Sequence, residues 1–260
     1  MRPPLDRPRL RKREIAFALA AGVFAAGGAA LVLEGSDGGP GPRAEVGEAS
    51  QMTYPVSDFE RIATTGPQEV EIEFGETFSV RADGAVTRLQ VVVENGELVI
   101  RPRNGTNWDW SDFDSTTIEV TMPRLTRVSL TGSGDVSIDR VKGDSFSALI
   151  EGFGGSISVD ELEVDQAEFT INGPGDIVAA GTARAARMTI NGPGEVQAGE
   201  LRSQTAAIEV NGPGDVELAV EREADISVQG PGEVDIDGPA RCSISTSGPG
   251  SVTCGNQEGD

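Results

Sequence analysis

The stretch EFTINGPGDIVAAGTARAARMTINGPGEVQAGELRSQTAAIEVNGPGDVEL, residues 168–218, repeats one short pattern three times. In each copy, a run of alternating apolar and polar residues precedes the triplet Gly-Pro-Gly, and a second such run follows it. Proline presets its own φ, and the glycine after it accepts the positive φ of a type II turn. Each triplet therefore predicts a tight turn between two β-strands.

The same turn recurs at nearly constant spacing through the second half of the chain. The final glycines of successive turns are 21, 20, 19, 20, 18 and 18 residues apart. The turns are Gly132-Ser133-Gly134, the degenerate Gly152-Phe153-Gly154-Gly155, and the triplets that begin at Gly173, Gly192, Gly212, Gly230 and Gly248 and end at Gly175, Gly194, Gly214, Gly232 and Gly250.

Aligning the copies on that final glycine produces apolar columns. The columns lie two and four residues after the glycine and six and four residues before it. Their members are Val136, Ile157, Ile177, Val196, Val216, Val234 and Val252; Ile138, Val159, Ala179, Ala198, Leu218, Ile236 and Cys254; Val128, Leu149, Phe169, Met188, Ile208, Ile226 and Ile244; and Leu130, Glu151, Ile171, Ile190, Val210, Val228 and Thr246. Mostly polar residues stand between them, as expected for strands with one buried face.

The repeat predicts an all-β fold, a single-stranded parallel β-helix with coils of about 18–21 residues. A hairpin meander would place successive turns at opposite ends of its strands and would not need the same triplet in every coil. The same turn at one coil length indicates coils stacked in parallel as a solenoid. The coil length favours a right-handed helix. Left-handed coils built from hexapeptides are the alternative, although no six-residue repeat is present.

Residues 52–131 are expected to form earlier, less regular coils of the same body. Strands are predicted at residues 78–82, 89–102 and 117–123, with Asn95-Gly96 as a hairpin-type turn.

The motifs from Thr117 onward resemble a known family. Met122-Pro123, Leu125, the turn Gly132-Ser133-Gly134-Asp135 and the Asn-Gly steps at Asn172, Asn191 and Asn211 resemble the autotransporter-adhesin "head GIN domain" family of bacterial cell-envelope proteins. The resemblance covers about residues 56–254, with proline replacing the usual serine in five turns. It implies a β-helical fold, an anchored or exported location and a role in adhesion or scaffolding, and it supplies no catalytic residues.

The first 51 residues predict a membrane tether. Residues 1–14 form a basic leader, residues 15–33 carry no charge and can cross a bilayer as a helix, and residues 34–51 form a flexible Gly- and Pro-rich linker. This places residues 52–260 in the periplasm, with a single-pass anchor in the bacterial inner (cytoplasmic) membrane and the N-terminus in the cytoplasm. A cleaved secretory signal is the alternative, and both interpretations place the body outside the cytoplasm. Ala18, Gly22 and Ala26 could pack two anchors together or simply reflect an alanine-rich segment.

Charge and composition exclude several functions. The formal net charge of the 260-residue chain is -21, which disfavours contact with nucleic acid, and the chain has no histidine to serve as a general base or metal ligand. Arg184, Arg187 and Arg222 are scattered rather than aligned, unlike the cationic residues of polysaccharide-cleaving β-helices. We therefore expect no enzyme activity, with a polysaccharide lyase or hydrolase as the least favoured alternative.

An acidic column follows the turns. Asp176, Glu195, Asp215 and Glu233 each stand one residue after the final glycine. Parallel stacking would bring their carboxylates together, so they either point into solvent or hold a cation such as calcium, which prefers oxygen ligands. The nine-residue period of calcium-binding β-rolls is absent.

Two further sets of residues have structural interpretations. Asn172, Asn191 and Asn211 occupy one position before each turn and predict a ladder of stacked side-chain amides. Cys242 and Cys254 fall in inward columns on either side of the last turn. They could form a disulfide in an oxidising compartment or remain two buried thiols.

The segment NGTNWDWSDFD, residues 104–114, contains the one aromatic cluster. Trp108, Trp110 and Phe113, with Asp109 beside them, could stack on a sugar ring or fold over the helix as a cap. Three hypotheses follow: a rigid surface for adhesion, scaffolding or protein contact; a module that binds carbohydrate such as cell-wall glycan; and a polysaccharide-cleaving enzyme. The sequence names no ligand or partner.

Overall fold

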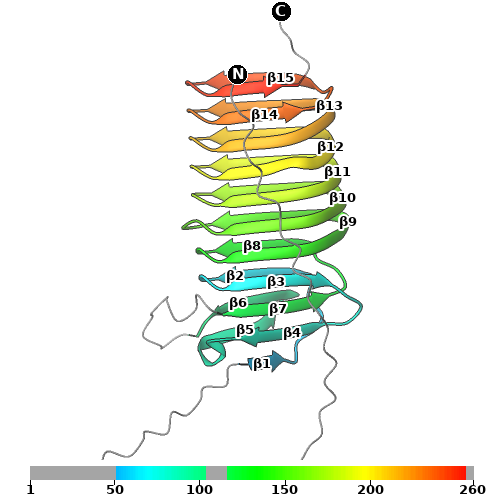
Figure 1. Ribbon diagram of the computed structural model, residues 1–260, viewed down its shortest axis with the longest axis vertical. Coiled ribbons are helices and arrows are strands. Elements are labelled where there is room, and N and C mark those ends of the chain that lie inside the picture. Colours follow the sequence, from blue (N-terminus) through cyan, green and yellow to red (C-terminus); the bar gives the residue numbers. More distant parts are fainter. Residues whose placement is uncertain (1–50, 104–115, 256–260) are drawn as a thin grey trace, which may run out of the picture. The chain divides into compact units, whose positions relative to one another are not determined.

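The computed structural model describes residues 51–103 and 116–255. Every described residue belongs to one compact unit, Val46–Asp260. This unit is a stack of β-coils, a parallel β-solenoid (Figure 1). Its strands are β1 (Gln51–Tyr54), β2 (Arg61–Thr65), β3 (Glu69–Phe74), β4 (Ser79–Asp83), β5 (Leu89–Glu94), β6 (Glu97–Pro102), β7 (Thr117–Met122), β8 (Arg127–Thr131), β9 (Asp135–Glu151), β10 (Ser156–Asn172), β11 (Asp176–Asn191), β12 (Glu195–Asn211), β13 (Asp215–Gln229), β14 (Glu233–Asp237), β15 (Arg241–Ser247) and β16 (Ser251–Cys254), and a short 3-10 helix, η1, covers Val86–Arg88.

The predicted parallel stacking is confirmed from β8 onward. Ser156 pairs with Asp135 below and with Asp176 above, and Asp176 pairs with Glu195. The register continues upward from Glu195 through β13, β14 and β16. Successive coils therefore lie in register, and the predicted columns become lines of side chains along the stack, except at Leu149 and Glu151.

Alternation places the aliphatic columns inside the solenoid. Ile157, Ile177 and Val196 occupy adjacent rungs and are fully buried. The residues between them face outward and are mostly exposed. Every buried side chain of the described residues lies between Phe59 and Cys254, so the fragment 46–260 contains the whole of the described core and is expected to fold alone.

The turns stack backbone on backbone, which explains why glycine recurs there. Gly212 has φ +125°, and a Cβ added to it would lie 3.1 Å from the carbonyl oxygen of Gly192 in the coil below. Larger residues would be strained by this φ and would also crowd the neighbouring turn. The stack of turns extends one coil below Gly132-Ser133-Gly134, the first turn that the sequence predicts: the amide of Gly134 donates to the carbonyl of Gly66.

The predicted columns are wrong just before the degenerate turn that begins at Gly152. Leu149 and Glu151 were expected to face inward, but Ala148 and Ile150 are the buried residues that align with Phe169 and Ile171. The turn Gly152-Phe153-Gly154-Gly155 has one residue more than Gly-Pro-Gly. Since side chains alternate with a period of two, that residue exchanges the inward and outward positions before the turn.

The N-terminal coils do not stack in chain order. β2 lies between β6 and β8, and β3 lies between β7 and β9, so the first coil is inserted between the second and the third (Figure 1). The expectation that each coil stacks on the preceding one is wrong here. Antiparallel pairs also occur, of β1 with β4, of β4 with β7 and of β5 with β6. The last of these confirms the hairpin turn at Asn95-Gly96.

The predicted anchor, residues 15–33, lies outside the described residues. In the part of the chain that the structure describes, no helix has the length and apolar character needed to span a bilayer.

Candidate functional site

The three asparagines before the turns form an amide ladder. The side-chain amide of Asn191 donates to the side-chain oxygen of Asn172 at 2.8 Å, and that of Asn211 donates to Asn191 at 3.0 Å. The ladder is exposed and ties adjacent coils together next to the turn. Its chemistry is structural, since each oxygen in these two bonds is occupied by the neighbouring asparagine.

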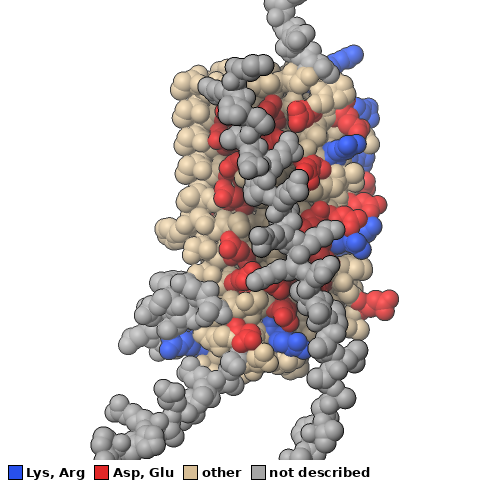
Figure 2. Space-filling view, in the orientation of Figure 1, with Lys and Arg blue, Asp and Glu red and all other residues tan. Residues whose placement is uncertain are grey.

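The acidic column is exposed to solvent. Asp176, Glu195, Asp215 and Glu233 are aligned by the register, and acidic side chains gather along the face shown in Figure 2. One oxygen of Asp215 accepts a hydrogen bond from the backbone amide of Glu233 at 3.0 Å. Among residues 51–103 and 116–255, no group of three or more acidic, histidine or cysteine side chains could hold a metal ion, and the calcium alternative gains no support.

The cysteines are joined at the last described coil. Cys242 of β15 and Cys254 of β16 form a disulfide, with Cα atoms 6.5 Å apart. The thiol sulfurs are therefore unavailable as metal ligands or nucleophiles. The cross-link connects the two strands of the final coil.

The predicted aromatic cluster cannot be placed in this geometry. Trp108, Asp109, Trp110 and Phe113 lie outside the described residues.

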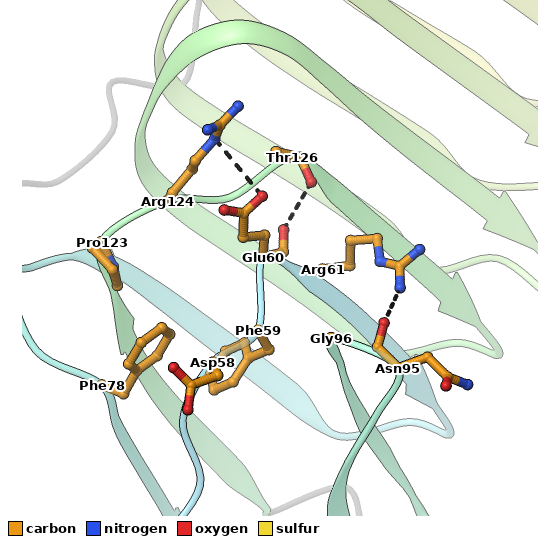
Figure 3. Close-up of a pocket in the computed structure, with 10 residues that line it drawn as sticks. All are labelled: Asp58, Phe59, Glu60, Arg61, Phe78, Asn95, Gly96, Pro123, Arg124 and Thr126. Atoms are coloured by element: carbon orange, nitrogen blue, oxygen red, sulfur yellow. Dashed lines mark hydrogen bonds and ion pairs between the residues drawn. The ribbon is translucent and has the colours of Figure 1, made fainter.

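A hollow of about 530 Å³ opens near the N-terminal end of the solenoid, where the out-of-order coil is inserted (Figure 3). β2 and its preceding loop meet the β5–β6 hairpin and the segment between β7 and β8 there. The lining residues are Asp58, Phe59, Glu60, Arg61, Phe78, Asn95, Gly96, Pro123, Arg124 and Thr126.

Two phenylalanines give this hollow an apolar wall. The ring centroids of Phe59 and Phe78 lie 4.9 Å apart, with the rings tilted by 49°. Phe59 is buried and belongs to the core, whereas Phe78 is half-buried and packs against it. The position of Phe59 is therefore fixed by the core, and Phe78 presents the more accessible ring.

Charged and polar groups surround that wall. Arg61 donates to the backbone oxygen of Asn95, and Arg124 forms an ion pair with Glu60 at 3.9 Å (Figure 3). The carbonyl of Glu60 accepts from both the amide and the hydroxyl of Thr126, at 2.8 and 3.0 Å. Donors and acceptors thus lie next to an aromatic surface, an arrangement that suits a polar ligand with one apolar face.

The backbone at this hollow departs from ordinary conformations. Among the described residues, Asp58 (φ 64°) and Asn95 (φ 52°) are the non-glycine residues with positive φ, and both line the hollow. Asn95 adopts this conformation as part of its hairpin turn. Asp58 has no such turn, but its side chain accepts from the Ser57 hydroxyl at 2.7 Å.

The sequence pattern does not predict this hollow. It predicts Asn95-Gly96 as a turn, but the neighbours of that turn come from β2 and from the segment after β7. These contacts join positions that are distant in sequence, and no local sequence pattern predicts them. The positive φ of Asp58 cannot be predicted from the residues around it, although aspartate tolerates a positive φ better than most residues do.

The comparisons with known proteins agree with this architecture. The sequence model of the family described as "Putative auto-transporter adhesin, head GIN domain" matches residues 58–240. A comparison with curated proteins finds none that matches. Among solved structures, a "putative adhesin" from Bacteroides fragilis is 24% identical, with a TM-score of 0.73 and coverage of 78% of this chain and 95% of that one.

Two further structures share the fold. A "putative adhesin" from Parabacteroides merdae is 20% identical with a TM-score of 0.63. A "putative lipid binding protein" from Parabacteroides distasonis is 19% identical with a TM-score of 0.62. Each comparison covers 78% of this chain and 95% of the other.

Proposed function

The chain belongs to the head GIN domain family, and from this membership we propose that it is a non-catalytic cell-envelope protein. Its rigid β-helix, which we take to be right-handed, presents an extended surface for adhesion, scaffolding or contact with another protein. The observation that supports this role best is the in-register stack, which holds outward side chains at repeats of about 4.8 Å along the body.

The proposed location is extracytoplasmic. Residues 1–14 stay in the cytoplasm, residues 15–33 cross the bacterial cytoplasmic membrane once, and residues 34–51 tether the body outside it. A disulfide between Cys242 and Cys254 is compatible with an oxidising compartment and unusual in the cytosol.

Fractionation tests this location. The full chain should remain with membranes through alkaline extraction, and its body should be degraded by protease added to spheroplasts. A full-length chain in the soluble cytoplasmic fraction would contradict the proposal. A shortened chain released from the membrane would favour the cleaved signal over the retained anchor.

The absence of histidine from the whole sequence and the solvent exposure of the acidic column support a non-catalytic role. This role is tested directly by incubating residues 46–260 with acidic polysaccharides, with and without calcium, and measuring product formation. No turnover is expected, and product formation above a heat-denatured control would overturn the non-catalytic assignment.

A second candidate function is the binding of carbohydrate such as cell-wall glycan, and one specific observation favours it. The hollow beside Phe59 and Phe78 combines an aromatic surface with charged and backbone hydrogen-bonding groups, as sugar-binding sites do. The segment 104–114, with Trp108 and Trp110, is the other candidate contact.

A glycan array separates the two functions. Any glycan retained by residues 46–260 should be lost in Phe78→Ala or Trp108→Ala. Phe153→Ala is the matched control, because Phe153 is 87% exposed on a turn outside the hollow. If no glycan is retained, or if Phe153→Ala removes binding equally, the carbohydrate hypothesis fails. Adhesion, scaffolding or protein contact then remains as the proposed function.

A further inference from the structure

The last described coil leaves its upper edge open. β15 pairs with β13 and β16 pairs with β14, and the described residues supply no strand beyond either of them. Ile244 continues the inward column of Ile226, which is 3% exposed, yet Ile244 is 47% exposed. The core column therefore reaches a surface at this end, alongside unpaired backbone groups.

Within the described residues, this edge carries little of the usual protection. Exposed edge strands are normally blunted by charged residues, proline or bulges, which prevent pairing with another chain. Residues 241–254 contain a single charged side chain, Arg241, and β15 pairs with β13 without a bulge. The strands directly beneath it carry Glu223 and Asp225 below β15 and Glu233 and Asp235 below β16, so the open edge is the charge-poor part of an acidic body.

The sequence of β15 is self-complementary for antiparallel pairing. Ile244 is the central residue of Arg241–Ser247. Two copies related by a two-fold axis through Ile244 would place it opposite itself, Ser243 opposite Ser245, and Arg241 opposite Ser247. No like charges face each other in this register, and the two isoleucines complete each other's exposed column.

We propose that two copies of this chain join end to end through β15, forming a two-fold symmetric dimer with a continuous sheet across the contact. The partner is a second copy because the register matches itself and because the acidic sides of the body repel one another. The contact removes the open edge and the exposed apolar surface together. It does not depend on the proposed adhesive function.

The test measures association of oxidised residues 46–260 by sedimentation velocity over a range of concentrations. A monomer–dimer equilibrium is expected. Because both bodies are negative, raising the salt concentration should strengthen dimerisation.

Variants locate the contact. Ile244→Lys places two cations opposite each other and should weaken the dimer about tenfold or more. Ser245→Lys should also weaken it. Ser227→Lys is the matched control, because Ser227 lies in the same outward column one coil lower and pairs with Ser245.

Hydrogen exchange provides the second measurement. Amides of β15 should become more protected as the concentration rises, while those of residues 223–229 should not change. A monomer at every concentration and salt level, or a dimer that Ser227→Lys weakens as much as Ser245→Lys, would overturn the proposal. Dimerisation that leaves the exchange rates of the β15 amides unchanged would also overturn it.

Discussion

Asn191 donates its side-chain amide to the side-chain oxygen of Asn172 across 2.8 Å, although 19 residues separate them in the chain. The same side chain accepts from Asn211 in the next coil. The side chain of Asn191 thus links three successive coils.

Asn191→Ala removes both ladder hydrogen bonds and should lower the free energy of unfolding by about 1 kcal/mol, because exposed hydrogen bonds each contribute modestly. Urea unfolding of residues 46–260 measures the change. Gln197→Ala is the control, since Gln197 is exposed on the neighbouring coil and outside the ladder. Equal effects of the two substitutions would mean that the ladder contributes nothing of its own.

Gly212→Ala should destabilise the stack by about 2 kcal/mol or more, because it adds backbone strain and a close contact with Gly192. Gly154→Ala separates the two effects. Gly154 also has a positive φ of 105°, but an added Cβ meets nothing within 4 Å. Thermal unfolding should show the larger loss for Gly212→Ala, and the reverse order would argue against close stacking of the turns.

Breaking the Cys242–Cys254 disulfide should loosen the last coil before the rest. The bond closes a 12-residue separation, for which loop-closure entropy predicts a contribution of roughly 2–3 kcal/mol. In Cys242→Ser, amide exchange should accelerate in β15 and β16, while β10 and β11 keep their protection. Uniform acceleration throughout the solenoid would contradict a local role for the cross-link.

Glu163 should titrate below its usual range. Its side chain accepts a hydrogen bond from Lys142, whose charge also attracts it across a 2.7 Å contact, and both effects lower the pKa of Glu163. Since the folded pKa is depressed, the pair stabilises the fold above the unfolded pKa of Glu163. That contribution is lost as pH falls through the folded value.

Carboxyl chemical shifts followed by NMR across acidic pH measure the pKa of Glu163. Lys142→Met should raise it toward the ordinary value for glutamate. A pKa of Glu163 that does not move in this variant would show that the ion pair is not formed in solution.

The regular coils could be predicted because their pattern is local. Column members such as Ile177 and Val196 are set by alternation and by the distance from each turn, and neither depends on distant contacts. The error at Leu149 has the same origin: a single extra residue in the turn at Gly152 reverses the alternation, and spacing alone does not say on which side of the turn it acts.

The N-terminal coils could not be predicted because their order depends on long-range pairing. β2 is placed between β6 and β8 by contacts that span tens of residues, and its own sequence, RIATT, fits any rung. The hollow beside Phe59 arises from that insertion and was missed for the same reason. The turn stack at Gly66-Pro67 was overlooked because Gln68 stands where the other turns have glycine.

The central claim is that consecutive coils lie parallel and in register, and inter-strand NOE contacts in residues 46–260 test it most directly. The account predicts contacts between the α-proton and amide protons of residues paired in register, such as Ile177 and Val196, repeated at Val216 and Val234. Strong contacts between pairs of α-protons on neighbouring coils, the mark of antiparallel strands, would contradict it.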